Sequence, residues 1–115
     1  MRTNGLVRGF VENGDIPWED VGQGIQRKVM AYDENLMLVR VKFESGGIGT
    51  VHKHPHSQIT HVESGAFEIE INGEKRVLRK DDAYYVPPET LHGAVCIDDG
   101  VLIDVFSPMR EDFIG

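Results

Sequence analysis

Apolar and polar residues alternate along much of the chain with the two-residue period of a half-buried β-strand. The clearest case is the segment 66–71, in which glutamates are predicted to face solvent and three apolar residues the interior: Phe67, Ile69 and Ile71. Asn72-Gly73 follows at once, and this pair suits the type I′ turn of a β-hairpin. The pattern therefore predicts a hairpin whose second strand runs over residues 74–78.

Similar strand-like patterns extend over most of the remaining sequence. Residues 25–30 and 36–43 predict two strands joined near Asp33, and one face of the second strand is apolar: Met37, Val39, Val41 and Phe43. Further short strands are predicted at 83–86, 93–97 and 101–106. About eight or nine strands without helical periodicity indicate an all-β sandwich, jelly roll or small barrel. The one helical turn expected is Arg110–Phe113.

Length and charge narrow the class of protein. A chain of 115 residues fits one compact domain, and residues 1–23 are interpreted as an irregular arm in which Trp18 packs on the domain edge. A net charge of -7 argues against nucleic acid or an acidic membrane as partner. The single Cys96 cannot form an internal disulfide, and no signal peptide or membrane span is apparent, so a soluble cytoplasmic protein is expected.

Four of the five histidines lie between Gly46 and Gly65. His52 and His54 are two residues apart, so on one strand both imidazoles would project from the same face. Gln58 has the same parity, and His92 at the start of a later strand can close the site from the opposite sheet. Three imidazoles and an amide oxygen suit one divalent ion such as Ni, Fe, Zn or Mn. A solvated histidine-rich loop is the alternative.

The spacing of these residues resembles the two motifs of the cupin superfamily. Gly46, His52-x-His54, Gln58 and Gly65 are similar to the first motif, and Asp82, Pro87 and His92 to the second. The resemblance implies a jelly-roll barrel (double-stranded β-helix) with four metal ligands, and leaves His56 and His61 as neighbours: His52, His54, Gln58 and His92. Gln58 stands where a glutamate is usual, which leaves the charge of the metal uncompensated and favours an acidic substrate. Asp81 and Glu89 stand where glycines are usual.

One charged residue interrupts an apolar strand near the end of the chain. Asp104 shares a face with Leu102 and Phe106, and burial of an unpaired carboxylate is costly. Partial burial would raise its pKa and suit it to acid–base chemistry near neutral pH. A structural aspartate bonded to backbone amides is the alternative.

Residues 102–113 closely resemble the end of the KdgF-type pectin-degradation cupins, and residues 16–32 resemble the same family. The resemblance implies a metal-dependent enzyme without a redox cofactor that converts 4,5-unsaturated uronates, released by pectin or alginate lyases, to linear 5-keto-4-deoxyuronate. It implies that Asp104 moves the proton, Arg110 binds the carboxylate and Phe106 shapes the wall. For Arg110, a surface ion pair with Glu111 or Asp112 is the alternative.

Several points stay open at the level of sequence. Cys96 could face the cavity or be a buried inert thiol, and either Arg27 or Lys28 could reach the substrate. An iron-dependent dioxygenase and a non-enzymatic sugar- or metal-binding module are the alternative functions. We expect a homodimer and a single cupin domain over 1–115, divided into arm (1–23), barrel (24–107) and tail (108–115).

Overall fold

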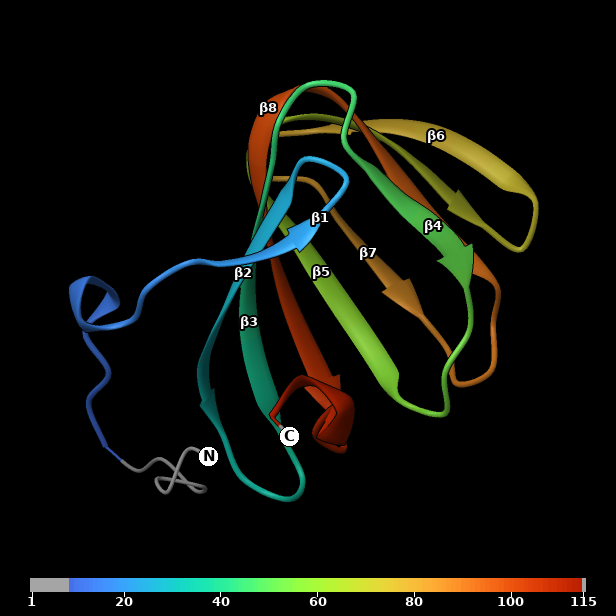
Figure 1. The fold of residues 1–115 in the computed structure, drawn as a ribbon. Coiled ribbons are helices and arrows are strands. Elements are labelled where there is room, and N and C mark those ends of the chain that lie inside the picture. The colour runs from blue at the N-terminus through green and yellow to red at the C-terminus, as the bar shows by residue number, and fades with distance from the viewer. Residues whose placement is uncertain (1–8, 115) are drawn as a thin grey trace.

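The computed structural model describes residues 9–114, which form an eight-stranded antiparallel sheet rolled into a barrel (Figure 1). The prediction of an all-β jelly roll is confirmed. The elements in chain order are η1 (Asn13–Asp15), β1 (Glu19–Gly22), β2 (Ile25–Tyr32), β3 (Met37–Phe43), β4 (Ile48–His52), β5 (Ser57–Ile71), β6 (Glu74–Arg79), β7 (Ala83–Val86), β8 (His92–Ser107) and η2 (Glu111–Phe113).

Two long strands form the frame of the barrel. β5 and β8 pair antiparallel from Ser57↔Ser107 to Ile71↔His92, and β3, β4, β6 and β7 attach to them. The prediction of separate strands at 93–97 and 101–106 is wrong, because β8 continues through both segments. β5 and β8 stay paired across the intervening polar residues, because register shifts between Val62 and Phe67 bend the strands without separating them.

Gly65 and Gly100 explain why the bend is possible. Gly65 has φ +83°, and a Cβ on Gly100 would clash with the Ser64 carbonyl oxygen. Only glycine permits both the left-handed conformation and this close approach of two backbones. Gly65 of the first motif therefore allows the two long strands to bend at the corner of the barrel.

The predicted hairpin is present with the expected turn. Asn72 and Gly73 have φ +50° and +87°, and Ile71 pairs with Glu74 across them. Asp81 and Glu89, which replace the usual glycines, also have positive φ (76° and 59°). The turns thus keep the conformation that glycine would adopt, at some cost in backbone strain.

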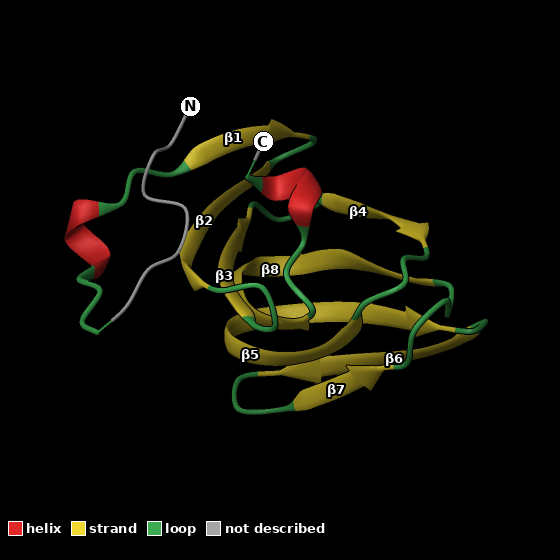
Figure 2. Cartoon of the chain, turned by 90° about the horizontal axis from the view of Figure 1, so that it is seen from below, coloured by secondary structure: helices red, strands yellow, loops and turns green. Residues whose placement is uncertain are grey.

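The strands curve around the interior of the molecule (Figure 2). This interior contains two apolar clusters. The first includes Phe43, Val62 and Phe67, and the second includes Met37, Val39 and Phe106. The predicted inner face of β3 is confirmed, since Met37, Val39 and Phe43 are buried and Val41 packs against both clusters. Within residues 9–114, no helix is long and apolar enough to cross a membrane.

Trp18 of the arm and Phe113 of the tail contact successive residues of β2, Lys28 and Arg27, whose side chains point to opposite faces. Trp18 is half-buried beneath the cationic groups of Lys28 and Lys42, each 4.6 Å from its ring centroid, as expected for an arm anchored on the domain edge. Residues 1–8 of the predicted arm and Gly115 of the predicted tail lie outside the described residues. A short 3₁₀ helix occurs at Glu111–Phe113, inside the segment predicted to form the last turn.

Candidate metal centre and adjoining cavity

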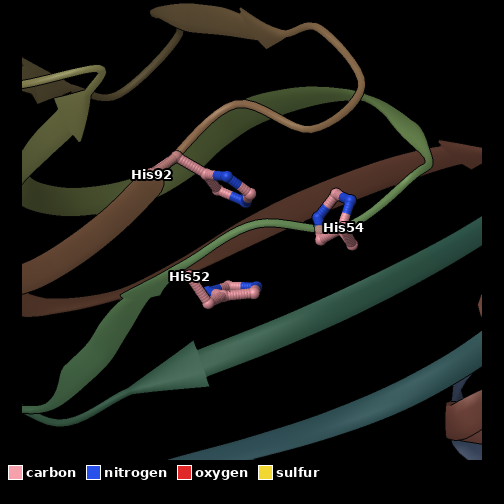
Figure 3. Close-up of side chains that lie close together, drawn as sticks. All are labelled: His52, His54 and His92. Carbon is pink, nitrogen blue, oxygen red and sulfur yellow. The ribbon is translucent and has the colours of Figure 1, made fainter.

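Three histidines lie close together, of which His52 is exposed and His54 and His92 are buried (Figure 3). Ligand atoms of His52, His54 and His92 lie within 4.8 Å of one another, and no other group of this kind occurs among residues 9–114. His52 ends β4 and His92 begins β8, directly opposite in the ladder. The prediction that His92 closes the site from an opposite sheet is therefore wrong, since β4 and β8 are neighbours.

His54 and Gln58 also differ from the simple strand-parity prediction. His54 lies in the connection after β4, and Gln58 belongs to β5, so the first three motif residues do not share one strand. The chain reverses between them and brings both side chains to the same point. The Nε2 atom of His54 lies 3.1 Å from Oε1 of Gln58, and both residues are buried.

Backbone carbonyls determine the orientation of two imidazoles. Nδ1 of His52 donates to the Thr50 carbonyl at 2.8 Å, and Nδ1 of His92 donates to the Thr90 carbonyl at 2.8 Å. A carbonyl can only accept, so Nε2 of each neutral ring carries a free lone pair. A hydrogen bond from the other ring nitrogen is the usual way in which proteins orient metal-binding histidines.

The protonation states of His54 and His92 also suit a cation. Desolvation, with a further contribution from the Arg110 charge, lowers the pKa of His54 to about 4. Desolvation also lowers the pKa of His92. Nδ1 of His54 is buried without a hydrogen-bond partner among the described residues. Neutral nitrogen donors beside an amide oxygen fit a borderline divalent metal ion.

A buried hydrogen-bonded chain leads from this cluster to Asp104. Nε2 of Gln58 donates to Oγ1 of Thr60 at 2.8 Å, and Thr60 donates to Oδ1 of Asp104 at 2.6 Å. Thr60 pairs with Asp104 on β8 and with Tyr84 on β7, so the three side chains lie side by side across the sheet. The carboxylate predicted to need a partner finds it in a side-chain hydroxyl and not in backbone amides.

Burial changes the acidity of this chain. Desolvation raises the pKa of Asp104 to about 6, although the Thr60 hydrogen bond and the Arg110 charge oppose the rise. The pKa of the Tyr84 hydroxyl is raised as well, first by burial and then by the Asp104 charge. Asp104 can therefore exchange a proton near neutral pH, while Tyr84 stays protonated.

The metal cluster and Asp104 line one cavity of about 340 Å³, at the lower end of the size range of small-molecule sites. The cavity wall includes six of the seven residues singled out from the sequence: His52, Gln58, His92, Asp104, Phe106 and Arg110. His54 packs behind them, with its ring centroid 4.8 Å from that of His92 and 5.8 Å from that of Phe106.

Arg110 combines both of its predicted arrangements. Its guanidinium makes two hydrogen bonds to Asp112, at 3.1 and 2.9 Å, and it also lines the cavity. The same guanidinium lies 4.3 Å from the centroid of Phe113 and 5.1 Å from that of Phe106. It is thus a buried cation held by aromatic rings and by an exposed carboxylate.

The choice between Arg27 and Lys28 follows from their positions on β2. Arg27 lines the cavity, with its guanidinium 4.0 Å from the Phe113 centroid and its Nε bonded to Glu19 at 3.1 Å. Lys28 lies on the other face, where its Nζ donates to Asn13. Of the two, Arg27 is the residue that a cavity ligand would meet.

The remaining candidates do not belong to the three-histidine cluster. His56 is half-buried with its ring centroid 5.2 Å from that of His54, and His61 is exposed beside Asp81. Cys96 is buried in the first apolar cluster, and burial raises its thiol pKa to about 11. Cys96 is therefore the inert core thiol of the two interpretations considered.

Sequence reasoning missed Thr60 and Tyr84. Thr60 lies two residues after Gln58, so strand parity placed it on the same inner face. A buried polar residue at that position, opposite a strand that carries one buried carboxylate, was the available signal. Tyr84 had none, because alternation in the short β7 leaves its facing ambiguous.

Comparison with known proteins is consistent with this architecture. Residues 39–106 match the cupin domain family. The chain is 46% identical over 110 residues to the pectin degradation protein KdgF of Dickeya dadantii (strain 3937), covering 94% of this chain and 100% of that protein. The structure of KdgF from Halomonas sp. is similar, with a TM-score of 0.90 and 47% identity over 94% of this chain and 100% of that one. An RmlC-like cupin from Shewanella frigidimarina has a TM-score of 0.93 and 40% identity, covering 96% and 99%.

Proposed function

Since the chain belongs to the cupin family, and within it to the relatives of KdgF, we propose that it converts 4,5-unsaturated uronate monosaccharides to linear 5-keto-4-deoxyuronate. The observation that carries the proposal is a single cavity in which a metal-binding cluster, a carboxyl group of raised pKa and a buried guanidinium meet. The relative named for pectin degradation supports the substrate class.

We propose that His52, His54, Gln58 and His92 hold one divalent metal ion, which is Ni, Fe, Zn or Mn. When bound there, such an ion supplies a Lewis acid for the substrate carboxylate and adjacent oxygen. The four ligands are all neutral, so an anionic substrate would add the negative charge that the ligand set lacks.

Arg110 and Phe106 hold the substrate in this proposal. The planar guanidinium of Arg110 exchanges its two bonds to Asp112 for two bonds to the uronate carboxylate. Phe106 is buried beneath that guanidinium and presents its ring to the cavity, where it limits the position of the sugar. The Arg110 charge thereby stays paired before and after binding.

Asp104 performs the proton transfer in this proposal. Its carboxyl proton adds to C4 of the enol ether, the bond between C1 and the ring oxygen breaks, and the C5 oxygen becomes a ketone. The proton lost from the anomeric hydroxyl replaces the one delivered to C4, so the reaction is an isomerisation without oxidant or reductant. A pKa of about 6 makes Asp104 a competent donor close to neutral pH.

The test follows the ultraviolet absorbance of the conjugated double bond in an unsaturated uronate mixed with the protein. We expect the absorbance to decay faster than the spontaneous rate, to do so without oxygen, and to lose this acceleration when a chelator removes the metal. Decay at the spontaneous rate with the metal-loaded protein would exclude the proposed reaction, and a requirement for oxygen would favour a dioxygenase.

Three further properties belong to the proposal. We expect substrates derived from pectin or alginate, action in the cytoplasm, and one domain made of arm (1–23), barrel (24–107) and tail (108–115). We also propose a homodimer, supported by exposed apolar residues on the outer side of β4 and β8: Ile48, Val51, Val95 and Ile97. Sedimentation at the mass of one chain would contradict the dimer.

A further inference from the structure

The Thr60 side chain bonds to both halves of the site. It is fully buried on β5, with 0% exposure, between the metal-cluster residue Gln58 and the carboxylate of Asp104. In the sheet it lies opposite Asp104 on one side and Tyr84 on the other. None of the roles assigned so far includes it.

When Asp104 is ionised, each hydrogen atom in this chain has one position. An ionised Asp104 only accepts, so the single hydroxyl hydrogen of Thr60 points to Oδ1, 2.6 Å away. Oγ1 of Thr60 is then an acceptor, and the Gln58 atom 2.8 Å from it must be the amide nitrogen. The amide oxygen of Gln58 consequently faces Nε2 of His54 and the histidine cluster.

We propose that Thr60 is a positioning residue that turns the Gln58 oxygen toward the metal cluster and holds the Asp104 carboxyl group in the cavity. The part that concerns Asp104 rests on the proposed function, whereas the part that concerns Gln58 requires only that the cluster binds a metal. One hydroxyl thereby links the ligand set to the proton-transferring group.

This link explains why an amide, and not a carboxylate, occupies position 58. A carboxylate there would have no hydrogen to donate to Thr60, so it would compete with Asp104 for the single hydroxyl hydrogen. One of two buried carboxylates would then lose its hydrogen bond, which is costly in a water-excluded interior. The amide of Gln58 supplies an oxygen on one side and a donor on the other.

The same chain tolerates a change in the protonation of Asp104. When Asp104 carries its proton on Oδ1, it donates to Thr60, and the Thr60 hydrogen can turn toward Tyr84, its neighbour in the ladder of β5 and β7. Gln58 donates to Thr60 in both states. The orientation of the metal-facing oxygen therefore stays constant while the proton moves.

The first experiment compares Thr60→Val, which keeps the shape and removes the hydroxyl, with Thr60→Ser, which keeps the hydroxyl. The affinity of each full-length protein for Zn²⁺ is measured by competition with a chromophoric chelator. Loss of a group that orients a metal ligand typically weakens binding about 10–100-fold, so this loss is expected for Thr60→Val, with Thr60→Ser within about threefold of wild type. Equal affinity of Thr60→Val and wild type would overturn the proposal.

A double-mutant cycle distinguishes action through Gln58 from a general loss of structure. In a Gln58→Ala background, Thr60→Val should cause almost no further loss of Zn²⁺ affinity, because the oxygen that it orients is gone. An additional loss as large as in wild type would overturn the proposal. Should Thr60→Val not fold, Thr60→Ala replaces it, with Val62→Ala as the control for lost methyl groups in the same strand.

The uronate assay separates this proposal from the proposed function. Absence of turnover by the wild-type protein would overturn the reaction and the Asp104 part, while the Zn²⁺ measurements still decide the Gln58 part. If the wild type is active, Thr60→Val should lower kcat and Thr60→Ser should restore it. Full kcat in Thr60→Val would overturn the link to Asp104.

Discussion

Asp104 is half-buried in a row of side chains contributed by four strands, with Val39 on one side and Thr60 and Tyr84 on the other. Its polar surroundings in that row are hydroxyl groups, and Arg110 is the charged group that acts on it. One hydroxyl bond and one cation only partly offset desolvation, so the pKa of Asp104 rises to about 6. A surface aspartate would lack this property.

This shift predicts the direction of a pH profile. The proton donor is the protonated form of Asp104, so kcat/KM for the uronate should fall as pH rises above about 6, by up to tenfold per pH unit. Asp104→Asn should lower kcat by about 10²–10⁴-fold and abolish the fall of kcat/KM with rising pH. Steady-state rates between pH 5 and pH 8, a range of roughly one unit or more on either side of the pKa, measure both effects.

A control for that experiment is Asp98→Asn, since Asp98 is exposed on β8 outside the cavity. It should leave the profile unchanged. A profile that rises through pH 6 would instead assign Asp104 as the base, and the direction of proton transfer proposed here would be wrong.

At the residue scale, the sequence identified side chains whose chemistry is unusual for their position. Histidines in a glycine frame and an aspartate in an apolar strand are visible because burial of such groups needs a reason. Thr60 is not unusual in a strand, and its role depends on which side chains the barrel brings within 3 Å of it. That information is absent from local patterns.

At the scale of elements, the tail and β1 meet over the cavity. Phe113 of η2 lies between the guanidinium groups of Arg27 and Arg110, at 4.0 and 4.3 Å, and its ring packs edge-on against Phe106. Arg27 is in turn bonded to Glu19 of β1. Neither element is long, so these contacts are what hold the wall of the cavity together.

Removal of the Phe113 ring should therefore affect substrate binding more than chemistry. Each cation–π contact contributes about 0.5–2 kcal/mol, so in Phe113→Ala we expect KM to rise about tenfold as the two arginines lose their orientation. Zn²⁺ affinity and kcat should change little, because Phe113 contacts none of the metal-binding side chains. Phe10→Ala is the matched control, since Phe10 is fully exposed. A fall in kcat without a change in KM would contradict this role.

The strands show what local patterns determine and what they do not. The hairpin at 72–73, the short strand 83–86 and the inner face of β3 follow from alternation and turn residues, and all were predicted. The continuity of β8 was not, because residues 98–100 read as a turn while their pairing depends on the facing glycine at position 65. The sequence prediction also put His54 on one strand with His52. Side-chain parity relates residues only within one strand, and β4 ends at His52.

At the scale of the whole molecule, the metal cluster joins segments that are otherwise loosely connected. His52 ends β4, His54 lies in the connection to β5, and His92 begins β8. β4 is exposed at four of its five residues and is paired with β8 alone in the sheet of the described chain. The apolar clusters contain no residue of β4 and leave its position to the ladder and the histidines.

A bound metal should consequently stabilise the protein, and chiefly at β4. At a free metal concentration about 100 times Kd, linkage adds about 2.7 kcal/mol to the free energy of unfolding, which raises Tm by roughly 10 °C in a domain of this size. Chelation should reverse this rise and increase amide exchange in Ile48–His52 before it does so in β5. His52→Ala should abolish the metal-dependent rise, whereas His61→Ala should retain it, since His61 is exposed and lies outside the cluster. An equal rise in both variants would show that the ion binds elsewhere, and would remove the metal centre from the barrel.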